Sequence, residues 1–240
     1  MYSVVELELS NIPFKPVIGQ ITGRRNDIIC MIFLLYSHFK GDKMIQILNK
    51  TDNLAIVIHE IYGINQHMES FCKRLSDQGF DVICPNLLER EQPFDYSEEK
   101  IAYRNFMENE GFIEAVHKIK NILLTFKNKY KKIYLIGFSI GATVAWLCSE
   151  EDYLDGIVGY YGSRIRNYKE KVPLCPTILF FPQEEQSFDV DELISNINNR
   201  NTEIHKFYGE HGFSDPYSRN YNAKSAQDAF NEMLKFIKIH

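Results

Sequence analysis

The sequence lacks long hydrophobic runs and an excess of basic charge. In 240 residues the longest apolar run is the nine-residue stretch 28–36, well short of the roughly 20 residues that a membrane-spanning helix needs. The 27 Lys and Arg residues stand against 32 Asp and Glu, a formal net charge of −5, so no basic surplus is available to neutralise nucleic-acid phosphates. We therefore expect neither a membrane protein nor a nucleic-acid-binding protein.

The sequence also lacks paired cysteines. Its five cysteines are spread without a CxxC pair, and no cluster of Cys and His has the spacing of a zinc site. Such cysteines are typical of reduced, buried thiols and predict a cytoplasmic protein. A signal peptide is disfavoured, because the apolar run lies late and the segment 36–40 is a poor cleavage site. We interpret residues 1–43 as a peripheral or poorly ordered extension and residues 44–240 as one globular domain.

From residue 54 onward, short apolar runs alternate with segments of helical periodicity. We expect strands at 54–58, 80–85, 132–136, 157–161, 177–181 and 203–208, and helices near 68–75, 97–109, 111–128, 141–150 and 226–237. Apolar strands without polar alternation, separated by helices, are typical of a mostly parallel α/β sheet covered on both faces. Such sheets bind ligands beyond the carboxyl ends of their strands, so functional residues are expected just after each strand.

One strand end carries a candidate nucleophile. The strand at 132–136 is followed by Gly137-Phe138-Ser139-Ile140-Gly141 and then by a helix. The pattern G-x-S-x-G is weak alone, but a strand that ends in this turn and opens a helix is the setting of a nucleophile elbow. Glycines allow the tight, strained turn, and the helix N-terminus favours negative charge near the hydroxyl. The alternative is an ordinary glycine-rich turn with a helix-capping serine.

A serine hydroxyl needs a base, and the base needs an orienting acid. In folds that carry a nucleophile elbow of this kind, the chain order is serine, then acid, then histidine. His205 lies within an expected strand, whereas His211 lies in the loop 209–213 beyond a strand end, where catalytic groups are usually displayed. These positions favour His211 as the base.

The acid should follow the expected strand at 177–181. Glu184, Glu185 and Asp189 all lie in that loop, and periodicity does not choose between them. A charged, solvated loop accounts for any two of the three.

Several ordered motifs over residues 50–238 together resemble the dienelactone hydrolase family of α/β-hydrolases. They are His59-Glu60-Ile61-Tyr62-Gly63-Ile64-Asn65, Cys84-Pro85-Asn86-Leu87-Leu88-Glu89-Arg90, Gly159-Tyr160-Tyr161-Gly162 and His211-Gly212-Phe213. The resemblance implies the α/β-hydrolase fold, with a mostly parallel central sheet and helices on both faces. It also implies an esterase or lactonase for small substrates that uses no metal or organic cofactor.

Transferred residue by residue, the resemblance implies that Ser139 is the nucleophile and His211 the base. Glu185 falls where the family has its catalytic aspartate, four residues beyond the phenylalanine that ends the strand. Glutamate can serve there, because its longer side chain still accepts the imidazole N–H. Asp189 is the alternative acid if the loop is shifted.

The resemblance implies four further site residues. The backbone N–H groups of Ile61 and Ile140 correspond to the oxyanion hole, which stabilises the charge of a tetrahedral intermediate. Glu60 matches a glutamate that contacts the resting nucleophile, with a buried structural carboxylate as the alternative. Arg90 matches one of two arginines that bind a substrate carboxylate, with a solvated loop arginine as the alternative.

Two departures from the family narrow the expected activity. The best-known members use a cysteine nucleophile, whereas this chain has Ser139, which favours ordinary carboxylester hydrolysis. The second substrate-binding arginine is replaced by Asp215, which would repel an anionic substrate unless Arg219 takes over. The short connection 86–110 provides little lid, which favours small substrates.

Two other functions stay open. A hydrolase-like fold that binds a small ligand without turnover would follow if neither candidate acid reaches His211. Acyl transfer or thioester hydrolysis would use the same serine. In each case we expect a small-molecule partner and a monomer or small homo-oligomer.

Overall fold

The computed structural model describes residues 44–240 except 89 and 198–200. Its centre is a seven-stranded sheet in the order β1-β3-β2-β4-β5-β6-β7, in which β1 runs antiparallel to β3 and the other pairs are parallel. The strands are β1 (Ile45–Ile47), β2 (Asn53–Ile58), β3 (Asp81–Cys84), β4 (Lys132–Phe138), β5 (Gly156–Tyr160), β6 (Thr177–Pro182) and β7 (Thr202–Phe207). The predicted mostly parallel sheet is confirmed. The extension predicted for residues 1–43 lies outside the described residues.

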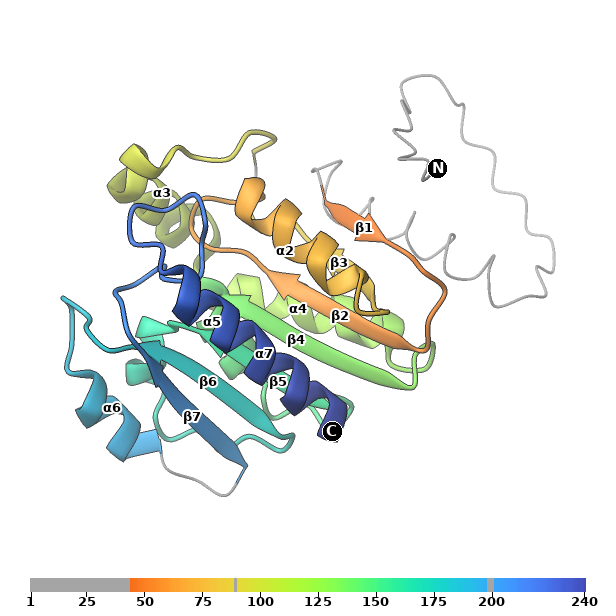
Figure 1. Ribbon diagram of the computed structural model, residues 1–240. Coiled ribbons are helices and arrows are strands. Elements are labelled where there is room, and N and C mark those ends of the chain that lie inside the picture. Colours follow the sequence, from red (N-terminus) through yellow and green to blue (C-terminus); the bar gives the residue numbers. More distant parts are fainter. Residues whose placement is uncertain (1–43, 89, 198–200) are drawn as a thin grey trace.

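Helices cover both faces of this sheet. They are α2 (Gln66–Ser76), α3 (Glu99–Asn105), α4 (Gly111–Phe126), α5 (Ile140–Leu147), α6 (Val190–Ile197) and α7 (Ala223–Ile239), with the short helical segments η1 (Tyr96–Glu98), η2 (Phe106–Glu110) and η3 (Ser163–Asn167). Figure 1 shows α2 and α7 in front of the sheet and α4 and α5 behind it. None of the helices in the described part of the chain has both the length and the apolar content of a membrane span.

Each face of the sheet has its own core, because successive strand side chains point to opposite faces. On one face, Val57 belongs to a cluster with Phe71 of α2 and Met233 of α7. On the other, Ile56 belongs to a cluster with Ile119 of α4 and Val144 of α5. Both faces of the parallel strands β2 to β6 are therefore buried, which explains why these strands lack polar alternation in the sequence, whereas the edge strand β7 is partly exposed.

One strand and one α-helix were not predicted from the sequence. β1 is an edge strand of three residues that pairs Ile45 with Cys84, too short for a recognisable period. α6 begins after Asp189, whose Oδ1 accepts the backbone N–H of Glu192 at 3.0 Å. Its buried Val190, Leu193 and Ile197 have helical spacing, so the pattern is present in the sequence, directly after the loop that holds the candidate acids.

The order of the strands fixes where a site can form. The chain leaves β2 for β3 on one side of it and later adds β4 on the other side. The loops after β2 and β4 therefore diverge, and a crevice beyond the carboxyl ends of these two strands is where ligands bind in such sheets. The segment 59–65 and Ser139 lie at these two strand ends.

Candidate active site

Ser139 stands in a strained turn between β4 and α5. Its φ is 52° and its ψ is −113°, a combination that costs of order 1–3 kcal/mol for a non-glycine residue. A Cβ on Gly137 would lie 2.2 Å from the carbonyl oxygen of Gly141, and one on Gly141 would lie 2.3 Å from that of Ile58. Only glycine fits these two positions. The backbone N–H of Ser139 donates to the Tyr160 oxygen at 2.9 Å, which ties the turn to β5.

A continuous hydrogen-bonded chain leads from this serine to an acid. His211 Nε2 lies 2.9 Å from Ser139 Oγ, and His211 Nδ1 lies 2.7 Å from Glu185 Oε1. An ionised carboxylate only accepts, so Nδ1 carries the ring proton and the Nε2 lone pair faces the hydroxyl. Burial works to lower the pKa of His211, but the hydrogen bond and charge of Glu185 outweigh it and raise that pKa above its ordinary value.

The other candidates for base and acid lie elsewhere. Asp189 is exposed and its carboxylate accepts a backbone N–H at the start of α6. Glu184 is also exposed. His205 lies in β7, where its Nε2 bonds Glu203 at 2.5 Å. Of the carboxylates considered after β6, Glu185 is the one that the structure brings to His211.

The two N–H groups expected in the oxyanion hole lie at the adjoining strand ends. Ile140 is the first residue of α5, where an N–H has no acceptor within the helix. The loop that holds Ile61 is fixed by His59, a residue for which no role was predicted. Leu87 N–H donates to His59 Nε2 at 2.9 Å, so Nδ1 carries the proton and donates to the backbone carbonyl oxygen of Glu60 at 2.6 Å. Burial lowers the pKa of His59 to about 4 and keeps it neutral.

Glu60 lies buried beside the hydrogen-bonded series of Ser139, His211 and Glu185. Its Oε1 accepts a hydrogen bond from Tyr161 OH at 2.8 Å, while Ser139 Oγ is hydrogen-bonded to His211. The ring centroids of Tyr161 and His211 are 4.9 Å apart, so Tyr161 links Glu60 to the imidazole. Burial, with the charge of Asp215, raises the pKa of Glu60 to about 7. The sequence placed Tyr161 in a family motif but gave no sign of this link.

Arg90 has partners of its own. Its guanidinium carbon lies 3.8 Å from the ring centroid of Phe94, and its Nε donates to the Gln92 oxygen at 2.7 Å. The residue is exposed. A stacked guanidinium keeps further N–H donors free for a ligand, so this position is compatible with substrate contact.

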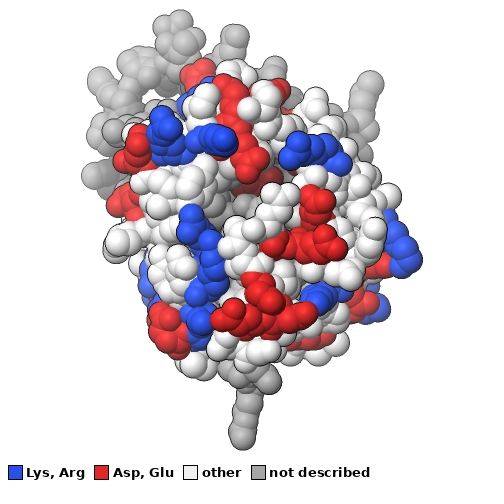
Figure 2. Space-filling view, turned by 90° about the vertical axis from the view of Figure 1, so that its left-hand side faces the viewer, with Lys and Arg blue, Asp and Glu red and all other residues white. Residues whose placement is uncertain are grey.

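A buried carboxylate occupies the position at which the family has its second arginine. Asp215 is 1% exposed and accepts hydrogen bonds from Tyr96 OH at 2.5 Å and from the Tyr217 N–H at 2.9 Å. Arg219, which could have replaced the missing arginine, is exposed. Figure 2 looks onto the side of the molecule where the parallel strands of Figure 1 end, and acidic and basic side chains are interspersed over it.

Comparison with known proteins identifies the family. The model of the dienelactone hydrolase family matches residues 48–240. The chain belongs to this family. It is 41% identical over 188 residues to the Bacillus subtilis protein YczH, a match that covers 77% of this chain and 90% of that protein. It is 28% identical over 205 residues to carboxymethylenebutenolidase of Pseudomonas putida, covering 77% and 84% of the two chains.

Solved structures share the fold. A dienelactone hydrolase-like promiscuous phosphotriesterase from metagenomic libraries matches with a TM-score of 0.63 and 15% identity, over 78% of this chain and 86% of the other. An esterase of Pyrococcus furiosus matches with a TM-score of 0.57 and 17% identity, over 81% and 86%. The fold is thus that of the α/β-hydrolases. As a member of the dienelactone hydrolase family, the protein is a hydrolase that acts on ester bonds of a small molecule.

Proposed function

We propose that the protein hydrolyses small carboxylic esters or lactones through an acyl-enzyme, with Ser139, His211 and Glu185 as a catalytic triad. The observation that carries the proposal is the continuous chain from Glu185 Oε1 to His211 Nδ1, 2.7 Å, and from His211 Nε2 to Ser139 Oγ, 2.9 Å. Both distances are those of good hydrogen bonds between a nucleophile, its base and an orienting acid.

In the first half of the reaction, His211 removes the proton of the Ser139 hydroxyl while Oγ attacks the ester carbonyl carbon. The tetrahedral intermediate carries its negative charge on the former carbonyl oxygen, which the N–H groups of Ile61 and Ile140 stabilise. His211 then gives its proton to the leaving alcohol as the C–O bond breaks. Glu185 holds the imidazole in the required tautomer and stabilises its protonated form.

In the second half, water attacks the acyl-enzyme. His211 takes the proton of the water as the hydroxide oxygen adds to the ester carbon, and it returns this proton to Ser139 Oγ when the acid leaves. The strained backbone of Ser139 keeps Oγ at the strand end throughout.

The charges around the site favour neutral substrates. Asp215 and Glu60 are buried carboxylates close to Tyr161 and His211, and an anionic acyl group would meet their repulsion. We propose that exposed Arg90 contacts the substrate from the rim of the site, as the family resemblance implies.

A matched series of p-nitrophenyl esters tests this proposal. We expect kcat/KM to be highest for acetate and butyrate, lower for the long octanoate, and lower for the anionic hemisuccinate than for a neutral ester of equal length. Equal or faster hydrolysis of the hemisuccinate would contradict the charge argument. Failure to hydrolyse any ester or lactone in the series would contradict the proposed function.

Two alternatives are tested by the same assay. Binding without turnover was the expected result if no acid reached His211, and the contact of Glu185 with His211 removes that reason. Acyl transfer would leave product esters rather than free acid when alcohols are added, so product analysis separates it from hydrolysis.

We also propose a cytoplasmic location, because the four described cysteines are free and buried. The monomer or small homo-oligomer stays a prediction.

A further inference from the structure

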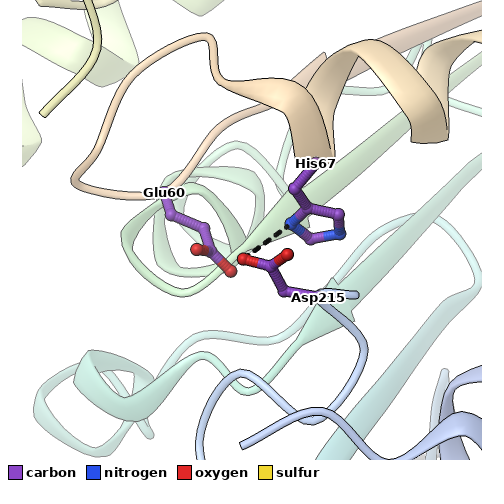
Figure 3. A group of neighbouring side chains, drawn as sticks. All are labelled: Glu60, His67 and Asp215. Carbon is purple, nitrogen blue, oxygen red and sulfur yellow. Dashed lines mark ion pairs between the residues drawn. The ribbon is translucent and has the colours of Figure 1, made fainter. Parts of the chain in front are cut away.

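We propose that Glu60, His67 and Asp215 bind one divalent transition-metal ion next to the proposed catalytic residues. The three side chains come from the loop after β2, the first turn of α2 and the loop that precedes α7. Figure 3 shows them pointing toward one another, and one ligand atom from each lies within 4.8 Å of the others. All three are buried, with exposed fractions of 5%, 2% and 1%.

The imidazole of His67 has an unused ligand atom. Within the described residues, its Nδ1 is buried and makes no hydrogen bond. The nearest charged atom recorded for it is Asp215 Oδ2 at 3.7 Å, beyond hydrogen-bond distance. Buried polar atoms almost always have partners, so an unpaired nitrogen that faces two carboxylates points to an ion at this position.

The charges of the cluster also fit a cation. An uncharged imidazole keeps a lone pair on one ring nitrogen, and this is the form in which histidine binds metal ions. Glu60 and Asp215 are both almost fully buried, and two carboxyl groups held together away from water are costly unless a cation balances their charge. A divalent cation would balance two carboxylates and accept the lone pair of the imidazole.

Neighbouring residues hydrogen-bond to both carboxylates and still leave lone pairs on their oxygens for a metal ion. Tyr161 OH donates to Glu60 Oε1, and Tyr96 OH donates to Asp215 Oδ2. Each carboxylate oxygen has two lone pairs, so both carboxylates can still bind a metal. Hydrogen bonds of this kind are common around metal ligands, which they orient.

The donor set indicates which cation would bind. One imidazole nitrogen and two carboxylates suit Zn²⁺ or a similar transition metal, with a fourth position left open. Ca²⁺ and Mg²⁺ prefer six or more oxygen ligands. Zinc bonds of about 2.0–2.2 Å require ligand atoms roughly 3.4 Å apart, so ligand atoms that lie as much as 4.8 Å apart would approach by up to about 1.4 Å on binding. The ion takes no part in the hydrolytic steps proposed above. The substrate preference expected there is that of the metal-free protein, because a bound divalent cation would offset the repulsion of the two carboxylates.

Calorimetry on the full chain, stripped of metal by a chelator, tests the site. We expect Zn²⁺ to bind with a stoichiometry near one and to raise the melting temperature, because an ion that binds only the folded state stabilises it. Mg²⁺ should produce neither effect. Because no ester is present and Ser139→Ala should bind zinc equally well, failure of the proposed hydrolysis and failure of this site are distinguishable.

Three variants locate the ion. His67→Phe removes Nδ1 and retains an aromatic ring against Phe71 and Phe138, and Asp215→Asn removes a charge. Both should lose at least 90% of the binding at the zinc concentration that saturates the wild type. His117→Gln removes an exposed imidazole from α4 and should bind normally. Circular dichroism checks that each variant is folded. If Asp215→Asn does not fold, the test of the site rests on His67→Phe alone.

Three results would overturn the proposal. One is the absence of stoichiometric zinc binding by the stripped wild type. Another is unchanged binding by folded His67→Phe. The last is an intense thiolate charge-transfer band when Co²⁺ replaces Zn²⁺, since this would place the ion on cysteines such as the neighbouring pair Cys72 and Cys84.

Discussion

Two histidines at the same end of the sheet each face a carboxylate through Nδ1, with opposite results. His211 Nδ1 lies 2.7 Å from Glu185, and its side chain is 37% exposed. His67 Nδ1 lies 3.7 Å from Asp215, and its side chain is 3% exposed. The pKa of His211 is raised, whereas burial lowers the pKa of His67 to about 4.

Exposure and hydrogen bonding determine which chemistry each of the two imidazoles can perform. A partly exposed ring with a direct hydrogen bond to an acid can gain and lose a proton near neutral pH, as a general base must. A ring that is buried without such a bond stays neutral, and its free lone pair suits a metal. The 1 Å difference in contact distance, together with burial, separates the two roles.

The most severe test of the role proposed for His211 is to remove Ser139 Oγ, the atom that its Nε2 faces. Ser139→Ala should lower kcat for p-nitrophenyl acetate by roughly 10⁶-fold, because removal of the nucleophile disables the whole triad. The melting temperature should stay close to that of the wild type, which separates lost chemistry from lost folding. Retention of a tenth of the activity would rule out Ser139 as the nucleophile.

A matched pair of neutral substitutions tests whether Glu185 or Asp189 is the acid of the triad. Glu185→Gln should lower kcat by roughly 10⁴-fold, because the amide does not stabilise the protonated imidazole. Asp189→Asn should leave kcat unchanged, since Asp189 caps α6. The reverse pattern in the same ester assay would make Asp189 the acid.

Replacing each histidine by phenylalanine compares their structural roles directly. In the metal-free protein, His211→Phe should lower the free energy of unfolding by about 1–3 kcal/mol, because it leaves the Glu185 carboxylate without its partner. His67→Phe should change it by less than about 1 kcal/mol, since it removes an atom that has no hydrogen bond. Urea denaturation measures both. A larger loss for His67→Phe than for His211→Phe would contradict the difference drawn here.

The pH dependence of hydrolysis should follow His211. Only the neutral ring accepts the serine proton, so kcat/KM should fall as the pH drops through a pKa that Glu185 holds above the ordinary value of about 6.5. In Glu185→Gln the acidic limb should move to lower pH, because burial still disfavours the charged ring and the carboxylate no longer opposes it. A limb that does not move between the two pH–rate profiles would mean that Glu185 does not set this pKa.

The sequence predicted much of the fold because the central strands are buried on both faces and so form uninterrupted apolar runs. The elbow was recognisable because the close approaches at Gly137 and Gly141 admit no side chain. β1 was not predicted, since three residues at a sheet edge carry no period.

The site was predictable only in part. Ser139 and His211 follow strand ends, whereas the choice of Glu185 over Asp189 depended on family resemblance. Residues 60, 67 and 215 have no common spacing, and the sequence predicted no metal; only the folded chain brings them within 4.8 Å. The same holds for the tautomer of His59, which depends on the contact with Leu87 N–H across two loops.

Covalent labelling tests the central claim most directly. The folded protein is treated with a fluorophosphonate probe, and the modified peptide is identified by mass spectrometry. We predict one label on Ser139, absent from Ser139→Ala and strongly reduced in His211→Ala, because the hydroxyl attacks only when its base is present. No label on the folded wild type, or a label on another residue that persists in Ser139→Ala, would contradict the claim that Ser139 and His211 form the reactive centre.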